Sequence, residues 1–125
     1  MRLLLDTHVL LWAMNVPKRL NRKTIALLNR AEVFVSAASV WEISIKAALG
    51  KIKVEPQRVL EALEPAGFDL LSVDGPHAVE VFSLGAHHGD PFDRLLVAQA
   101  KCERMTLLTS DETLLAYGSF VQMAE

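Results

Sequence analysis

The sequence predicts a single α/β domain over residues 1–125, with a central parallel sheet of four to five strands and helices on both of its faces. Short apolar runs alternate with longer amphipathic segments, which is typical of strands that helices cover on both sides. These runs lie at residues 3–5, 32–35, 69–73 and 106–109, with a further short run at 119–123. At 125 residues and 51% hydrophobic composition, the chain can bury one generous core.

The segments between the apolar runs are predicted to be helices. They cover residues 7–14, 21–31, 37–49, 57–66 and 76–86, and two more begin after Asp90 and Asp111. Asp90 can accept hydrogen bonds from the free amides of a helix start, and Pro91 fits the first helical position. Thr7 is the expected cap of the first helix, and Gly50 fits the end of the third.

Two of these helices carry apolar residues whose environment can be predicted. Residues 9–14 are apolar on every side, so we expect this helix to be deeply buried or partly covered by another chain. In the helix at 76–86, we expect Val79, Phe82 and Ser83 to face the core.

Composition and charge narrow the class of protein. Thirteen Lys and Arg against fifteen Asp and Glu give a net charge of −2, unlike the basic character of many nucleic-acid binders. A nucleic-acid substrate stays open if the acids gather in one site, where bound cations offset them. Cys102 is the single cysteine, which excludes an internal disulfide. Asp6 interrupts the apolar start and no run of about eighteen apolar residues follows, so we expect no signal peptide, no membrane partner and a cytoplasmic location.

Acidic residues are expected to gather at one edge of the sheet. Asp6 and Asp111 directly follow predicted strands, while Glu42 and Asp93 lie about one helical turn further on. The carboxyl ends of parallel strands share one edge, which is where open α/β sheets bind ligands. Carboxylates this close together would repel one another unless cations neutralise them. We therefore expect Asp6, Glu42, Asp93 and Asp111 to be the catalytic and metal-binding residues of a Mg²⁺ or Mn²⁺ site.

Each of these acids also has a purely structural explanation. Ser39 and Glu42 fit a capping box, in which the acid only satisfies backbone amides, and Glu42 can pair with Lys46 four residues later. Asp93 follows the Asp90 cap, and Asp111 can cap the last helix. The placement of all the acids at one sheet edge nevertheless favours a metal site.

Polar neighbours of the acids are candidates for supporting roles. Thr7, Ser39 and Ser110 carry hydroxyls that could orient ligands or waters, although a capping role is the simpler explanation. Arg94 fits a phosphate contact and a structural ion pair equally well. The histidines, which are His8, His77, His87 and His88, do not have a metal-ligand spacing with the acids, so Zn²⁺ is not favoured.

The chemistry that such a site supports is phosphodiester hydrolysis. One cation lowers the pKa of a bound water to make the nucleophile, and a second would stabilise the leaving oxygen. The sequence leaves open whether one or two ions bind.

A family resemblance runs over essentially the full chain. Its motifs are Leu4-Leu5-Asp6-Thr7-His8, Ser36-Ala37-Ala38-Ser39-Val40-Trp41-Glu42-Ile43, His88-Gly89-Asp90-Pro91-Phe92-Asp93-Arg94 with Ala98-Gln99-Ala100, and Leu107-Leu108-Thr109-Ser110-Asp111. In this order they resemble the PIN-domain ribonucleases, and specifically the VapC-type toxins of type II toxin–antitoxin systems.

The resemblance implies a fold, an activity and partners. The fold would be the PIN version of a parallel α/β domain, and the activity that of an endoribonuclease. Asp6, Glu42, Asp93 and Asp111 match the acidic residues that surround Mg²⁺ or Mn²⁺ in the family. The substrate would be structured RNA such as transfer RNA. A VapB-type antitoxin would cover the active-site groove, and the chain would form a homodimer.

Two other functions stay open. The domain could be a non-catalytic PIN-like protein-binding module in which the acids are only helix caps. It could also be a haloacid-dehalogenase-like phosphatase with Asp6 as the covalent nucleophile. Those phosphatases need a second acid two residues further on, where this sequence has His8, so the phosphatase is the weaker alternative.

Overall fold

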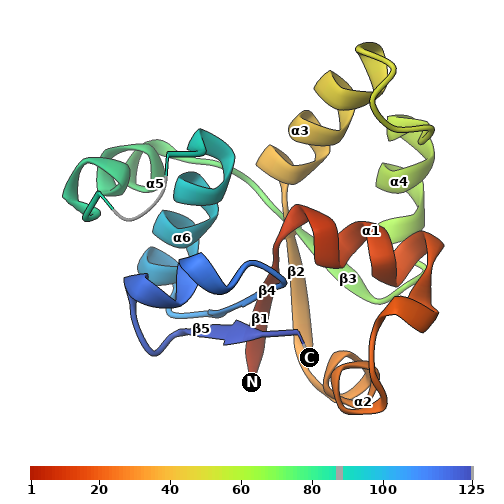
Figure 1. Cartoon of the computed structure of the whole chain (residues 1–125), viewed down its shortest axis with the longest axis horizontal. Helices are drawn as coiled ribbons and strands as arrows, with labels where there is room; N and C mark the ends of the chain where they lie inside the picture. Colours follow the sequence, from red (N-terminus) through yellow and green to blue (C-terminus); the bar gives the residue numbers. More distant parts are fainter. Residues whose placement is uncertain (87–88, 125) are drawn as a thin grey trace.

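The computed structural model describes residues 1–86 and 89–124, and its centre is a five-stranded sheet in the order β3-β2-β1-β4-β5 (Figure 1). The strands are β1 (Arg2–Leu5), β2 (Glu32–Ser36), β3 (Phe68–Leu71), β4 (Thr106–Thr109) and β5 (Val121–Met123). Every neighbouring pair is parallel, so the predicted sheet is confirmed and all carboxyl ends lie at one edge. His87 and His88, which were weighed as metal ligands, lie outside the described residues.

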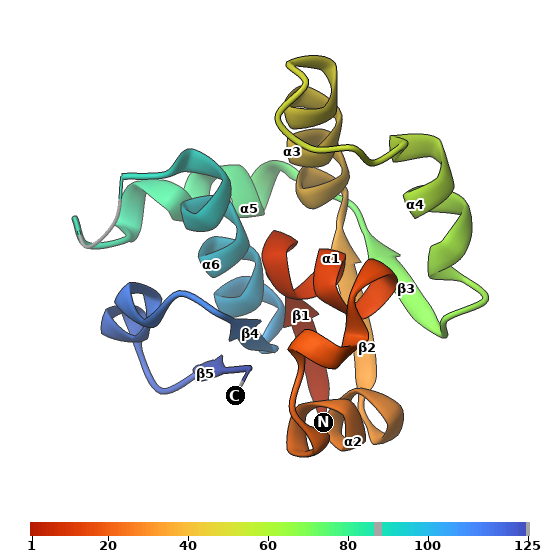
Figure 2. The same cartoon turned by 45° about the vertical axis from the view of Figure 1, so that its right-hand side comes forward.

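Helices lie on both faces of this sheet, as predicted. They are α1 (Thr7–Asn15), α2 (Arg22–Arg30), α3 (Ala37–Ala48), α4 (Pro56–Leu63), α5 (Gly75–Glu80) and α6 (Pro91–Glu103), with short 3₁₀ turns η1 (Pro17–Arg19), η2 (Val81–Ser83) and η3 (Glu112–Tyr117). α6 covers one face, while α1, α2 and α4 lie over the other (Figure 2). No helix within the described ranges is long and apolar enough to cross a membrane.

The central strand β1 contributes to a hydrophobic core on each side of the sheet. Leu3 and Leu5 point into the core beneath α1, α2 and α4, and Leu4 points into the core beneath α6. All three leucines are fully buried. Because successive side chains of a strand alternate between faces, a strand covered on both sides must be apolar at every position.

Helix caps agree with the sequence at some ends and differ at others. Asp90 caps α6, because its carboxylate accepts hydrogen bonds from the amides of Phe92 at 2.8 Å and Asp93 at 3.1 Å. Asp6, and not Thr7, caps α1 by accepting from the amide of Val9 at 2.8 Å. Thr7 is therefore the first helical residue, and its hydroxyl is available for tertiary contacts.

The residues predicted to face the core from the helix at 76–86 are exposed in the structure. The segment forms α5 and η2, and Val79 is 72% exposed and Phe82 94% exposed, with Ser83 also at the surface. His77 is buried instead, and its ring Nε2 lies 2.7 Å from the carboxylate of Glu103 on α6. This buried polar contact orients α5, so the apolar side chains turn outward.

The first helix is buried along one side only. Val9 and Leu10 are fully buried, whereas the residues from Leu11 to Met14 are half-buried and pack against the edge of the core. The guanidinium of Arg19 in η1 lies 4.7 Å from the centre of the Trp12 ring. Part of the apolar surface of α1 is thus covered by the chain's own next turn.

Leu4→Ala should lower the free energy of unfolding by about 2–5 kcal/mol, because it leaves a cavity beneath α6. Phe82→Ala removes a larger side chain that is 94% exposed, and should change this energy by less than about 0.5 kcal/mol. Urea unfolding followed by circular dichroism measures both. Similar losses in the two variants would contradict the core described for β1.

Candidate active site

Asp6 lies at the carboxyl end of β1, in the middle of the sheet, and is 3% exposed. One carboxylate oxygen accepts from the amide of Val9 in α1, and the other accepts from the amide of Ser110 at 3.2 Å and from the hydroxyl of Thr109. Burial raises the pKa of the Asp6 carboxyl, and the hydrogen bonds from Thr109, Val9 and Ser110 act in the opposite direction. Asp6 therefore joins β1, α1 and the end of β4.

Thr7, Ser39 and Glu42 form a buried polar group beside Asp6. Thr7 Oγ1 lies 2.6 Å from Glu42 Oε1 and 3.0 Å from Ser39 Oγ, which connects the first turn of α1 to α3. A hydroxyl has one proton, so Thr7 donates it to the carboxylate and accepts from Ser39. These contacts bring the predicted residues Thr7, Ser39 and Glu42 together at the sheet edge, and Asp6 directly precedes Thr7 in the chain.

The predicted capping box of α3 is wrong, although the predicted ion pair is confirmed. Ser36 caps α3 by accepting from the amide of Ala38 at 3.0 Å, which places Ser39 and Glu42 inside the helix. Glu42 Oε2 instead lies 3.0 Å from the ammonium of Lys46, one turn further along α3. The Glu42 carboxylate thus contacts Thr7 of α1 and Lys46 of its own helix, and not the amides at its own helix start.

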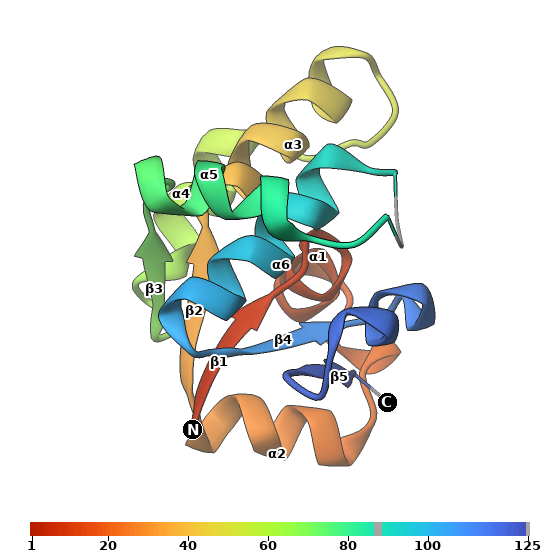
Figure 3. The same cartoon turned by 90° about the vertical axis from the view of Figure 1, so that its left-hand side faces the viewer.

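Asp93 lies in the first turn of α6. Figure 3 shows that α6 begins at the edge of the sheet where the strands end. The rings of Trp41 on α3 and Phe92 on α6 pack edge to face, with their centres 5.0 Å apart. Each aromatic residue directly precedes one of the candidate acids, Glu42 or Asp93. This contact holds the two acid-bearing turns next to each other.

Asp111 follows β4 and caps η3. Its carboxylate accepts from the amide of Thr113 at 3.0 Å and from the hydroxyl of Thr113 at 2.7 Å. Its own amide donates to Thr109 Oγ1 at 3.0 Å, and the Thr109 hydroxyl donates to Asp6. The predicted capping role of Asp111 is confirmed, and the half-buried residue is tied to Asp6 through Thr109.

Thr109 is a site residue that the sequence analysis missed. It is fully buried and ends β4, and it was interpreted only as a β-branched strand residue. Its position directly before Ser110 and Asp111, at the end of the strand next to β1, is the signal that could have found it.

Arg94 is held by the fold. Its guanidinium donates to the carbonyls of Gly85 at 3.0 Å and Val81 at 3.3 Å, and to the hydroxyl of Tyr117 at 3.1 Å. These bonds fasten η2 and the residues after it to the start of α6 and to η3. A phosphate contact for Arg94 stays a prediction.

A second cluster of possible ligands lies away from this edge, between α5 and α6. The ligand atoms of Asp74, His77 and Glu103 lie within 4.8 Å of one another, an arrangement that the sequence did not predict. His77 Nδ1 accepts from the amide of Asp74 at 3.1 Å, so the neutral ring carries its proton on Nε2 and donates it to Glu103 at 2.7 Å. Both ring nitrogens are then engaged, which makes the cluster a structural network that docks α5 on α6.

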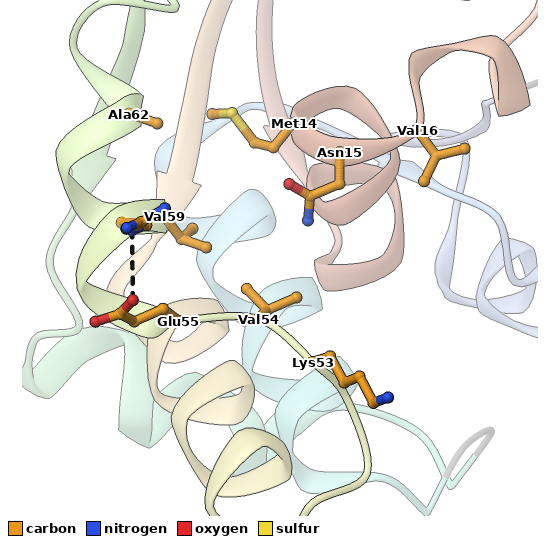
Figure 4. Close-up of a pocket in the computed structure, with 9 residues that line it drawn as sticks. Met14, Asn15, Val16, Lys53, Val54, Glu55, Val59 and Ala62 are labelled. Atoms are coloured by element: carbon orange, nitrogen blue, oxygen red, sulfur yellow. Dashed lines mark ion pairs between the residues drawn. The ribbon is translucent and has the colours of Figure 1, made fainter.

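A groove lies between the end of α1 and α4 (Figure 4). It has a volume of about 690 Å³, and its lining residues are Met14, Asn15, Val16, Lys53, Val54, Glu55, Arg58, Val59 and Ala62. None of the candidate acids is among these lining residues. The groove is therefore distinct from the acidic edge, by which we mean the carboxyl-terminal edge of the sheet with Asp6, Glu42, Asp93 and Asp111.

The fold and this edge define an α/β protein with an oxygen-rich site at the carboxyl ends of a parallel sheet. A family model described as PIN domain matches residues 3–119. The chain belongs to the PIN domain family. A comparison with curated protein sequences finds no match to this chain.

Solved structures with a similar fold come from toxin–antitoxin systems. VapBC2 from Rickettsia felis, bound to a DNA fragment from its promoter, has a TM-score of 0.76 and 15% sequence identity over 100% of both chains. FitAcB from Neisseria gonorrhoeae has a TM-score of 0.67 and 25% identity over 98% of this chain and 96% of that chain. A toxin–antitoxin complex from Klebsiella pneumoniae has a TM-score of 0.68 and 19% identity over 98% of this chain and 97% of that chain. These structures confirm that the fold resembles that of proteins in VapBC and FitAB complexes, as the sequence motifs predict.

Thr109→Val keeps the shape of the side chain and removes the hydroxyl between Asp6 and the amide of Asp111. We expect the free energy of unfolding to fall by about 1–3 kcal/mol, because a buried carboxylate loses a donor and an amide loses its acceptor.

Thr106→Val, at the other end of β4, is the matched control, and should change this energy by less than about 0.5 kcal/mol. Thermal and urea unfolding measure both variants. A Thr109→Val protein as stable as the wild type would show that the bridge contributes nothing.

Proposed function

We propose that this chain is a metal-dependent endoribonuclease toxin that hydrolyses phosphodiester bonds of structured RNA such as transfer RNA. The observation that carries the proposal is the buried group of Asp6, Thr7 and Glu42 at the carboxyl edge of the sheet, in a PIN domain. Asp93 and Asp111 lie at the same edge and complete the proposed set of catalytic and metal-binding residues. The proposed location of the activity is the cytoplasm.

The donor set at this edge fits Mg²⁺ or Mn²⁺. It consists of carboxylate and hydroxyl oxygens, which are the ligands that these hard cations prefer, whereas Zn²⁺ typically takes nitrogen and sulfur ligands. Asp6 is a buried carboxylate whose pKa burial raises, so a nearby cation would stabilise its charge. When bound, the ion would lower the pKa of a water molecule and so supply the nucleophile.

The protein residues have separate tasks in this proposal. Asp6, Glu42, Asp93 and Asp111 would hold the ion. Thr109 and the amide of Ser110 orient the Asp6 carboxylate, and Thr7 orients that of Glu42. These donors are fixed by strands and helix starts, so the Asp6 and Glu42 carboxylates are held in place. No three of the four acids, all of which the structure describes, have ligand atoms within 4.8 Å of one another, so side chains would have to turn toward the ion when it binds.

A VapB-type antitoxin is the proposed protein partner. The solved relatives include VapBC and FitAB complexes. As the family resemblance implies, part of the antitoxin would cover the acidic edge, and the groove between α1 and α4 offers it a further contact. Met14, Val54 and Val59 give the groove an apolar floor, and Lys53 gives it positive charge. The charge of Arg58 is balanced by Glu55, whose carboxylate lies 3.3 Å from the guanidinium (Figure 4). A partner segment with apolar and acidic side chains fits this lining.

A homodimer is the proposed state of the free chain. Trp41 on α3 is 60% exposed, and Leu49, the residue directly after α3, is 64% exposed. Ile45 lies between them, one helical turn from each. Beside Trp41 is an apolar hollow of about 230 Å³, which is lined by Ala37, Ala38, Trp41, Val73 and Leu95. Exposed apolar surface of this kind is typical of subunit interfaces.

Asp6→Asn should reduce metal-dependent RNA cleavage by at least about 100-fold, because it removes the charge of a proposed metal ligand. Asp69→Asn, on the exposed side of β3, changes the net charge equally and should retain full activity. The measurement is cleavage of total cellular RNA by the purified chain with Mn²⁺ or Mg²⁺, beside an EDTA control. Intact RNA with folded wild-type protein and either metal would contradict the nuclease.

The runner-up is a non-catalytic protein-binding module. The observation that favours it is that Asp6 and Asp111 both cap helices and so already have a structural use. This alternative expects Asp6→Asn and Asp93→Asn to leave Mn²⁺ affinity unchanged, whereas the nuclease expects a large loss. Membership of the PIN family does not support the haloacid-dehalogenase-like phosphatase.

Trp41→Glu should convert the proposed dimer to a monomer, because a charge in an apolar interface is left without compensation. Leu60→Glu on α4, where the leucine is 39% exposed, is the control and should leave the dimer intact. Sedimentation velocity at several protein concentrations measures the mass. A wild-type chain that is monomeric throughout would contradict this assembly.

A further inference from the structure

The two carboxylate oxygens of Glu42 contact different partners. Oε1 lies 2.6 Å from the hydroxyl of Thr7, on the inner side of the site. Oε2 lies 3.0 Å from the ammonium of Lys46. The Glu42 side chain is 7% exposed, whereas that of Lys46 is 33% exposed, so a buried acid faces a cation that reaches in from the surface.

We propose that Lys46 is an internal counter-ion that occupies the place of the divalent cation at Glu42 and must leave when the metal binds. The inference rests on the proposed function, because it takes Glu42 as a metal ligand. Lys46 is a positioning residue in this scheme. It holds the Glu42 carboxylate in place in the metal-free protein and raises the metal concentration that the site needs.

Electrostatics and geometry both favour this exchange. An ammonium and a divalent cation at the same carboxylate oxygen would repel each other strongly in a buried site. The lysine ammonium sits on a flexible stem, and its partial exposure gives it a way out to solvent. Lys46 lies in the last turn of α3, where the helix dipole favours a positive charge after the ammonium has moved away.

An ordinary ion pair on a helix surface would not make the effect of losing the lysine depend on the metal. Such a pair joins two exposed side chains, and its loss has the same effect with and without metal. Here, removal of Lys46 from the metal-free protein leaves the buried Glu42 carboxylate with Thr7 as its remaining observed donor. In the metal-bound protein the same removal costs little, because the divalent ion compensates the charge.

The first test is Mn²⁺ binding by the purified full chain, measured by isothermal titration calorimetry. Lys46→Met keeps the apolar stem, and should bind Mn²⁺ about three- to tenfold more tightly than wild type, because the competing cation is gone. Lys51→Met removes the same charge from an exposed lysine just beyond α3 and should stay within about twofold of wild type. Binding by Lys46→Met that is no tighter than by Lys51→Met overturns the inference.

The second test separates exchange from a merely structural role. Lys46→Met should lower the melting temperature in EDTA, and saturating Mn²⁺ should remove most of that loss. An equal loss in EDTA and in Mn²⁺ overturns the inference. Lys46→Arg, which keeps the cation, should resemble wild type under both conditions.

Two further measurements, on Lys46→Gln and on the wild-type chain, make every outcome decisive. If Lys46→Met does not fold, Lys46→Gln provides a neutral donor to Glu42 and should also bind Mn²⁺ more tightly; unchanged affinity overturns the inference. A wild-type chain that binds no Mn²⁺ overturns both this inference and the proposed function. Normal wild-type binding with no gain in the Lys46 variants overturns the role of Lys46 alone.

Discussion

The burial of the Asp6 carboxylate is the constraint on which the rest of the site depends. An uncompensated buried carboxylate costs on the order of several kcal/mol, so the fold must bring donors to it. Those donors come from the start of α1 and from the end of β4, which lie on either side of Asp6 in space and about a hundred residues apart along the chain. Satisfying this one side chain therefore positions the centre of the sheet edge.

The neighbouring acid depends on the same arrangement. With Asp6 as the cap of α1, Thr7 becomes the first helical residue and its hydroxyl reaches across to Glu42 and Ser39 on α3. The helix cap and the proposed metal site are thus one structure. This dual use also explains why a capping role and a metal-binding role for Asp6 are compatible: each carboxylate oxygen has more than one lone pair.

The acidic edge, the groove and the proposed dimer surface are separate parts of the molecular surface. The acidic edge lies where the strands end, and the groove lies between α1 and α4. The proposed dimer surface is formed by the exposed apolar residues Trp41, Ile45 and Leu49. The network of His77 and Glu103 is used for docking α5 on α6. Substrate and a second subunit would then be bound by different residues, with α3 connecting the acidic edge to the proposed dimer surface.

The sequence by itself determined the parallel sheet, the cap at Asp90 and the placement of four acids at one edge, because strand and helix periods and helix caps are local signals. The tertiary structure alone decided which hydroxyl meets which acid and which side of α5 is buried. Thr7 meets Glu42 and Thr109 meets Asp6 across 35 and 103 residues of chain. His77, in turn, reverses the face that the apolar pattern of α5 predicts. Such contacts depend on how distant segments pack, and no local pattern of residues encodes that packing.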